Sequence, residues 1–242
     1  GTRTFLHPVN ISGAIMPFPV NGEYGAPQTS YSDHYVDTRI DNKKPGFKLE
    51  CPPLQPMLVA TTLDGHGKTH AEIMKQRPFL QVLIALQRDG FRPKSSGGKV
   101  YLKSDGSPGL DYPVSNYVWK GIRDAFLAMA EIQFAAGAKA VAPVHRDAGI
   151  YSSPREVKHA IAGLPMEILK ARLFSAHVMG GCPMGEDPVK SVVNSNGRHH
   201  EVENLSVFDG SIFPTSIGAN PMETIFASTA KFAGDLAREM IN

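Results

Sequence analysis

The stretch Ser175-Ala176-His177-Val178-Met179-Gly180-Gly181-Cys182-Pro183-Met184-Gly185 opens the part of the chain that decides its fold. Its three glycines and one proline predict a tight turn region, in which Cys182 and the methionines pack as apolar groups. A His, a Cys and two Met would also suit a soft metal, but a blue-copper site needs a second imidazole. The nearest pair, His199-His200, has neither the order nor the spacing for copper, so we expect no metal.

A second informative segment follows an expected apolar strand over residues 204–208 and leads into an expected amphipathic helix over residues 221–240. Asp209-Gly210 follows the strand, and Asn220-Pro221 opens the helix as a good N-cap and first-turn residue. The first N–H groups of such a helix carry partial positive charge, which suits an anion. A well-capped helix without any ligand explains these residues equally well.

Outward from these segments, hydrophobic spacing and turn residues predict an α+β fold, with a mixed or antiparallel sheet flanked by helices. One helix should run from a cap at Ser115 or Asn116 to a stop at Gly137. Two further helices are expected over residues 70–87, kinked or started by Pro78, and 153–169, interrupted by Pro165. Extended segments are expected over residues 10–15, 57–62, 99–103, 110–114, 140–143 and 191–193.

Composition excludes several classes of protein. The chain has 242 residues, of which 42% are hydrophobic, and 25 Lys and Arg against 23 Asp and Glu leave a net charge of +2. This balance is not that of a nucleic-acid binder, and two cysteines cannot build a disulfide scaffold. The longest nearly apolar run, residues 78–86, is too short to span a bilayer. Gly65-His66-Gly67-Lys68-Thr69 lacks the first glycine of a phosphate-binding loop, so we interpret it as a solvated turn.

The first residues show none of the sequence features of a targeting signal. The chain opens with Gly1-Thr2-Arg3-Thr4, without an initiator Met, a basic region or an apolar region. This start is typical of the middle of a protein. We expect a soluble chain, cytoplasmic rather than exported, although signals upstream of Gly1 would decide the compartment.

Together, the two segments resemble the C-terminal part of the glucose–methanol–choline (GMC) family of FAD-dependent alcohol oxidoreductases. The matching motifs are His177 with the turn over residues 180–185, Val192-Val193-Asn194, Gly197-Arg198-His199-His200-Glu201-Val202-Glu203-Asn204-Leu205, Asp209-Gly210-Ser211-Ile212-Phe213-Pro214-Thr215, Asn220-Pro221 and Thr224. Glu201 stands where the family usually has Gly. Residues 4–8, 24–28 and 134–138 look, more loosely, like bacterial members.

The resemblance implies oxidation of an alcohol or sugar hydroxyl, with a hydride passing to N5 of FAD. It implies that His177 is the general base and that Asn220 hydrogen-bonds the substrate oxygen. Cofactor contacts are implied for Asp209, Gly210, Asn220, Pro221, Met222 and Thr224. We interpret His199 and His200 as turn residues. No role is predicted for the remaining histidines, which show no paired pattern: His7, His34, His66, His70, His145 and His159.

The resemblance also implies a domain plan. Residues 1–9 would end a segment of the FAD-binding domain, residues 10–172 would form the substrate domain, and residues 173–242 would add a strand and a helix to a Rossmann-like FAD-binding domain. No Gly-x-Gly-x-x-Gly occurs, so we expect a C-terminal fragment, inactive alone, whose partner is the missing N-terminal FAD half.

The substrate would be a small-molecule alcohol, and the electron acceptor would be oxygen, a quinone or a cytochrome. Alternatively, the chain is a non-catalytic subunit or binding module that pairs with a separate FAD-bearing chain.

Overall fold

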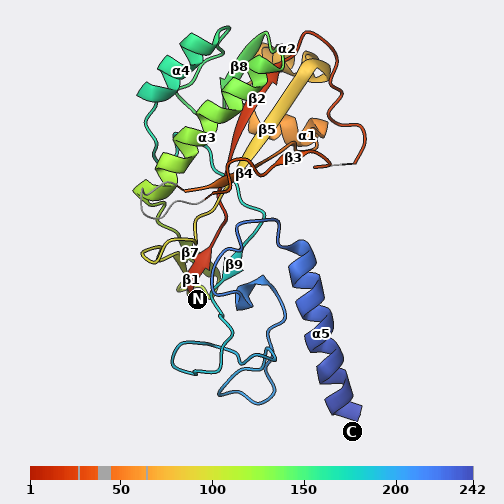
Figure 1. Cartoon of the computed structure of the whole chain (residues 1–242), viewed down its shortest axis with the longest axis vertical. Coiled ribbons are helices and arrows are strands. Elements are labelled where there is room, and N and C mark those ends of the chain that lie inside the picture. Colours follow the sequence, from red (N-terminus) through yellow and green to blue (C-terminus); the bar gives the residue numbers. More distant parts are fainter. Residues whose placement is uncertain (27, 38–44, 64, 242) are drawn as a thin grey trace. The chain divides into compact units, whose positions relative to one another are not determined.

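The computed structural model describes residues 1–26, 28–37, 45–63 and 65–241, and the chain divides into two compact units (Figure 1). One unit combines Gly1–Pro8, Arg88–Val114 and Ser175–Asn242, and the other combines Val9–Gln87 and Ser115–Phe174. The segment Arg88–Val114 therefore belongs with the two ends of the chain, although the sequence places it inside one 10–172 domain. Two residues of the family-like stretches, Pro27 and Asn242, lie outside the described residues.

The unit made of Val9–Gln87 and Ser115–Phe174 is built on a five-stranded antiparallel sheet in the order β3-β4-β5-β2-β8. Its central strand β5 (Leu80–Gln87) pairs with the whole of β2 (Val9–Ile15), from Val9 opposite Leu86 to Ile15 opposite Leu80. The remaining strands are β3 (Tyr31–Ser32), β4 (Phe47–Glu50) and β8 (Ala140–Pro143). The strands expected over residues 10–15 and 140–143 are confirmed.

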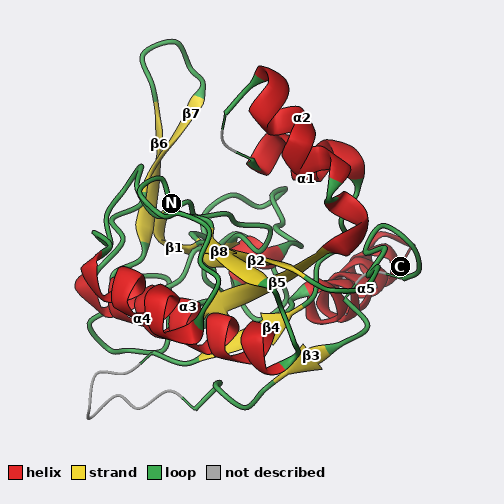
Figure 2. Ribbon diagram, turned by 90° about the horizontal axis from the view of Figure 1, so that it is seen from above, coloured by secondary structure: helices red, strands yellow, loops and turns green. Residues whose placement is uncertain are grey.

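Helix α3 (Asn116–Ala135) packs against β2, β5 and β8, and α4 (Pro154–Gly163) packs beside it (Figure 2). Both helices begin as predicted, because the Ser115 and Ser153 side chains accept hydrogen bonds from the backbone N–H groups of Val118 and Glu156. Gly137 follows α3 with a φ of +90°, the left-handed conformation expected at its end. Helix α4 ends before Pro165.

Two predictions in this unit are wrong. Residues 70–87 form α2 (Gly67–Lys75), a 3-10 turn η1 (Arg77–Phe79) and the strand β5, rather than one helix. Pro78 ends the helical pattern, and the following apolar run is a strand hydrogen-bonded on both edges, so its hydrophobic residues need no helical spacing. The extended segment expected over residues 57–62 is helix α1 (Pro56–Thr62), in which the Thr61 and Thr62 hydroxyls bond back to carbonyls of the same helix.

The unit that contains the chain ends has a four-stranded antiparallel sheet in the order β7-β6-β1-β9. Strands β6 (Gly98–Leu102) and β7 (Pro108–Asp111) form the predicted hairpin, and β6 also pairs with β1 (Thr2–Phe5). The short strand β9 (Met179–Gly180) pairs with the other edge of β1. Gly180 has a φ of +77°, and a Cβ atom there would collide with the Arg3 carbonyl, so the turn motif needs glycine at this position.

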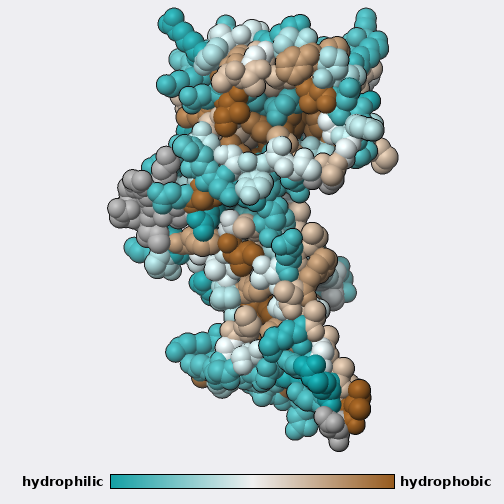
Figure 3. Space-filling model, turned by 45° about the vertical axis from the view of Figure 1, so that its right-hand side comes forward, coloured by the Kyte–Doolittle hydropathy of each residue, from teal (hydrophilic) through white to brown (hydrophobic). Residues whose placement is uncertain are grey.

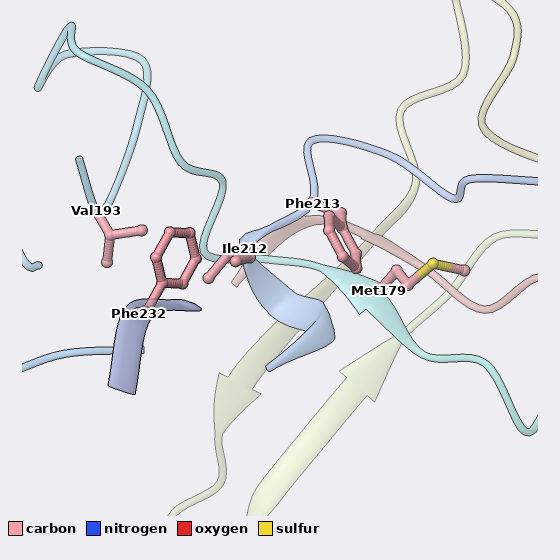
Figure 4. Close-up of a cluster of buried hydrophobic side chains, with 5 residues drawn as sticks. All are labelled: Met179, Val193, Ile212, Phe213 and Phe232. Atoms are coloured by element: carbon pink, nitrogen blue, oxygen red, sulfur yellow. The ribbon is translucent and has the colours of Figure 1, made fainter. Parts of the chain in front are cut away.

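A buried hydrophobic cluster joins β9, the 3-10 turn η2 (Gly210–Ile212) and the last helix, α5 (Met222–Ile241). Figure 4 shows its five side chains, which are Met179, Val193, Ile212, Phe213 and Phe232. The helix predicted over residues 221–240 is confirmed by α5.

The strands predicted over residues 191–193 and 204–208 are not regular strands. The first makes only isolated bridges, at Val193, and the second only one, between Arg198 and Ser206. Neighbouring turns satisfy this backbone, because the Val207 N–H donates to Gly197 and the His199 N–H donates to Leu205. Val207 and Phe208 still pack against the cluster, so their apolar character serves the core.

Among the described residues, no helix combines the length and the hydrophobicity needed to cross a membrane. Helix α5 nevertheless exposes large apolar side chains. Met222 is 61% exposed, Phe226 64%, Met240 79% and Ile241 85%. Hydrophobic surface is visible beside the described end of this helix in the space-filling view (Figure 3).

Candidate functional site

Strand pairing at the start of the chain determines the surroundings of His177. Strands β1 and β9 are antiparallel, with Thr4 opposite Gly180 and Phe5 opposite Met179. Extending this antiparallel register, two residues after Phe5 and two residues before Met179, sets His7 opposite His177. The Nδ1 atoms of these two rings are 3.0 Å apart, within hydrogen-bond distance, and the ring centroids are 5.1 Å apart.

Sequence reasoning gave no role to His7, which the structure places beside His177. Its side chain is fully buried, whereas His177 is half-buried. The two residues are 170 positions apart, and only the β1–β9 register brings them together. No motif near His7 gives a sign of the contact. The signal that could have found it is the pairing of the first strand with the glycine turn.

A buried carboxylate holds the backbone of His7. The His7 N–H donates to Oδ2 of Asp89 at 3.2 Å, and the Tyr112 hydroxyl donates to the same oxygen at 2.6 Å. Burial raises the pKa of Asp89, although the bonds from Tyr112 and His7 work in the opposite direction. The pKa of Tyr112 is raised by its own burial and by the Asp89 charge, so its hydroxyl remains a donor.

The loop that leads to Asn220 packs on the segment that carries Asp89. The Thr215 hydroxyl donates to the Gly90 carbonyl at 2.9 Å. Gly218 has a φ of +67°, and a Cβ atom there would lie 2.5 Å from both the Arg88 side chain and the Phe91 ring. The loop before Asn220 is therefore tightly fitted against residues 88–91.

Asp209 and Gly210 lie at the start of η2. Asp209 is exposed, and its Oδ1 accepts from the Ser211 N–H at 2.8 Å, which makes it the cap of this turn. Gly210 is buried, and a Cβ atom there would lie 3.1 Å from the Val178 carbonyl oxygen and 3.2 Å from Ile225 Cδ1. Gly210 thus brings the residue after His177 into close contact with the first turns of α5.

Helix α5 begins at Met222, one residue later than predicted. The Pro221 carbonyl accepts the first helical hydrogen bond, from the Ile225 N–H at 2.9 Å. Met222, Glu223 and Thr224 are exposed in the first turn. Their N–H groups carry the partial positive charge of a helix start, and the Glu223 carboxylate occupies the same region.

All predicted site residues therefore fall in one unit, the one that combines both chain ends with Arg88–Val114. His199 and His200 hold turns: the His199 Nδ1 accepts from two backbone N–H groups, and the His200 Nε2 contacts the Ser191 hydroxyl and the Gly185 carbonyl. Within the described ranges, no three His, Cys, Asp or Glu side chains gather in a way that could hold a metal ion.

Comparison with known proteins identifies the class. The sequence profile of the GMC oxidoreductases, in its C-terminal domain, matches residues 93–229. The chain therefore belongs to the GMC oxidoreductase family. The matched range includes the glycine turn after His177, η2 and the start of α5.

Relatives and solved structures agree with this assignment. A long-chain-alcohol oxidase of Arabidopsis thaliana, FAO4A, is 32% identical over 48% of this chain and 17% of its own length. An uncharacterized GMC-type oxidoreductase of Sinorhizobium fredii, y4nJ, is 30% identical over 59% of this chain and 28% of its own. The crystal structure of a pyridoxine 4-oxidase from Mesorbium loti shares the fold with a TM-score of 0.61 at 19% identity, covering 98% of this chain and 43% of that one. The chain thus spans less than half the length of these proteins.

Proposed function

We propose that this chain supplies the catalytic base and the substrate domain of an FAD-dependent oxidoreductase that acts on a CH–OH group. The observation that supports this proposal most directly is the environment of His177. This residue precedes the glycine turn, and its Nδ1 lies within hydrogen-bond distance of Nδ1 of the buried His7 imidazole. Membership of the GMC family, which includes alcohol oxidases among its relatives, supports the reaction class. Residues 10–172 are proposed to contain most of the substrate domain.

In the proposed reaction, His177 takes the hydroxyl proton of the substrate at Nε2, since its Nδ1 faces His7. The O–H bond breaks as the N–H bond forms, and the carbon loses a hydride as its bond to oxygen becomes double. Bound FAD supplies the two-electron acceptor for that hydride, at N5. Imidazole suits the proton transfer because its pKa lies near neutral pH. Asn220 is proposed to donate a hydrogen bond to the substrate oxygen and so to hold it beside His177.

The same unit offers contacts that fit a flavin. Gly210 has no side chain, so the η2 backbone lies close against the Val178 carbonyl, next to His177. The exposed first turn of α5 presents N–H groups, at Met222 and Thr224, toward which negative charge on a reduced flavin is favoured. Asp209 and Gly210 are proposed to contact the ribityl or pyrophosphate part, and the backbone around Pro221 and Met222 to face the pyrimidine edge.

The proposal requires a dinucleotide-binding segment from outside these 242 residues, because they contain no Gly-x-Gly-x-x-Gly. That segment could lie on the same polypeptide or on a separate FAD-bearing chain. The electron acceptor is proposed to be oxygen, a quinone or a cytochrome. Co-purification of a separate protein with a Gly-x-Gly-x-x-Gly motif would favour the two-chain arrangement.

The experiment is His177→Ala in the longest gene product that carries these residues, with His159→Ala, at an exposed position of α4, as the control. Loss of general-base catalysis lowers kcat by about 10²- to 10⁴-fold. The visible flavin absorbance should stay unchanged in both variants, and His159→Ala should keep full turnover. Unchanged turnover in His177→Ala with flavin still bound would contradict the assignment of the base.

A further inference from the structure

We propose that His7 is a positioning residue that fixes the tautomer and the ring orientation of His177. In this arrangement His177 carries its proton on Nδ1 and donates it to Nδ1 of His7, across the observed 3.0 Å. The inference rests on the proposed role of His177 as base, and it concerns a residue that the family motifs leave without a role.

The hydrogen bond has two possible directions, and they differ in chemical consequence. A neutral imidazole has one N–H donor and one acceptor nitrogen, so one Nδ1 must donate and the other must accept. If His7 donated, the proton of neutral His177 would lie on Nε2, and that nitrogen could not accept a proton from substrate. If His177 donates, its Nε2 carries the lone pair that a base needs. The proposed chemistry therefore selects His7 as the acceptor.

The pair also determines which ring takes the substrate proton. When His177 becomes an imidazolium, its Nδ1–H still points at the neutral His7 nitrogen. Protonation of both rings would set two N–H donors and two positive charges against each other at this distance. His7 is fully buried, which further disfavours its charged form. The pair thus holds one added proton, on Nε2 of His177.

His7 itself is held in an unusual conformation. Its φ is +49°, a left-handed value that is uncommon for any residue but glycine, and it precedes Pro8, a position that favours extended backbone. The hydrogen bond from its N–H to Asp89, backed by the Tyr112 hydroxyl, holds the backbone in that conformation. Such strain is typical of functional positions and requires a surrounding structure that enforces it. Asp89 and Tyr112 therefore hold the backbone of His7, and the His7 ring in turn contacts His177.

A first experiment reads the tautomers directly, without cofactor or substrate. Long-range ¹H–¹⁵N spectra of the ¹⁵N-histidine-labelled 242-residue chain distinguish a proton on Nδ1 from one on Nε2, and His7→Asn and His177→Gln variants assign the two rings. We expect His177 to carry its proton on Nδ1 and His7 on Nε2, with a scalar coupling between the two Nδ1 atoms across the hydrogen bond. A proton on Nε2 of His177, or no coupling between the rings, would overturn the proposal.

A second experiment separates positioning from packing. In the longest gene product that carries these residues, His7→Leu keeps the apolar volume and removes the acceptor, whereas His7→Asn keeps a carbonyl oxygen near the place of Nδ1. Misplacement of a catalytic group costs roughly 100-fold, so kcat of His7→Leu should fall by about that factor while KM changes little. His7→Asn should recover a large part of the loss. Equal kcat in His7→Leu and His7→Asn would contradict the acceptor role.

The matched control is His145, a buried histidine whose Nε2 contacts the Pro165 carbonyl at 2.8 Å. His145→Leu should reduce stability without a selective loss of kcat. The two proposals fail separately. If His177→Ala keeps full turnover, the base is wrong whatever His7 does. If His177→Ala loses turnover but His7→Leu behaves like His145→Leu, only the positioning role is wrong.

Discussion

At the scale of single residues, Asp89 is the anchor beneath the histidine pair. It is 3% exposed, and one of its oxygens accepts from both the His7 N–H and the Tyr112 hydroxyl. Removing an acceptor leaves its buried donors without a partner, which costs about 1–3 kcal/mol for each donor. The Asp89 carboxylate therefore stabilises the folded state through these two hydrogen bonds, although its burial is itself unfavourable.

We predict that Asp89→Ala lowers the free energy of unfolding by about 2–4 kcal/mol, because two donors lose their acceptor. Asp89→Asn should lose less, since its amide oxygen can still accept. Urea unfolding of both variants and the wild type checks the order. An equal loss in both variants would show that the acceptor oxygen does not matter.

The difference in stability between Asp89→Asn and the wild type should also depend on pH. The pKa of Asp89 is raised in the folded state, so ionisation is easier in the unfolded chain. Its contribution to stability is therefore complete below the unfolded pKa, about 3.9, and is lost as pH rises through the folded pKa. The stability of Asp89→Asn relative to wild type should increase from about pH 4 upward and then level off. A difference that is constant with pH would contradict the raised pKa.

Residue types around Asn220 were enough to predict the start of α5 to within one residue, whereas the roles of His177 and Gly210 stay predictions. They could not predict His7, because a hydrogen bond between residues 170 positions apart depends on strand pairing. Local sequence carries spacing information over a few turns of chain. It carries no information about the edge of β1 with which the two-residue strand β9 pairs.

At the scale of elements, the apolar run after Pro78 shows where periodicity fails. Strand β5 pairs with β2 on one edge and β4 on the other, and five of its eight residues are buried in succession. A strand buried on both faces loses the alternation that identifies strands, and its sequence then resembles a buried helix. In contrast, the starts of α3 and α4 were predictable because each has a serine cap.

The pairing of β1 with β9 depends on Gly180, and this gives a prediction for an element. Gly180→Ala places a side chain at a φ of +77° and against the Arg3 carbonyl, so the two strands must separate. We expect a loss of stability of about 2 kcal/mol or more, and loss of the coupling between His7 and His177. Thermal unfolding and the histidine spectra measure the two effects.

Gly163→Ala is the control for this prediction. Gly163 ends helix α4, its φ is not positive, and a Cβ atom there meets nothing within 4 Å. Alanine should be neutral or stabilising by about 0.5–1 kcal/mol at such a site. If Gly180→Ala leaves the histidine coupling intact, the β1–β9 register is not what brings the two rings together.

At the scale of the whole molecule, the composition gives no sign of the apolar surface that helix α5 exposes. The net charge of +2 and the 42% hydrophobic content are those of a typical globular chain. Yet helix α5 buries Phe232 and exposes Met222, Phe226, Met240 and Ile241. Composition counts apolar residues without placing them, so only the structure shows that the helix at the proposed flavin edge keeps much of its apolar surface in solvent.

The final prediction concerns FAD itself. The contacts proposed for FAD, at Asp209, Gly210 and the first turn of α5, are few, and these 242 residues contain no Gly-x-Gly-x-x-Gly loop of the kind that cradles a pyrophosphate in dinucleotide-binding folds. We therefore expect the purified 242-residue chain to be colourless and to bind added FAD weakly.

The shift in Tm on adding FAD measures this binding. At an FAD concentration equal to Kd, binding stabilises a protein by only about 0.4 kcal/mol, a Tm shift of about 1 °C. A tight site saturated a thousandfold would add about 4 kcal/mol. A complete GMC flavoenzyme with its Gly-x-Gly-x-x-Gly segment is the positive control. A yellow preparation, or a Tm rise of about 8 °C or more with FAD, would show that these residues hold the cofactor without a further segment.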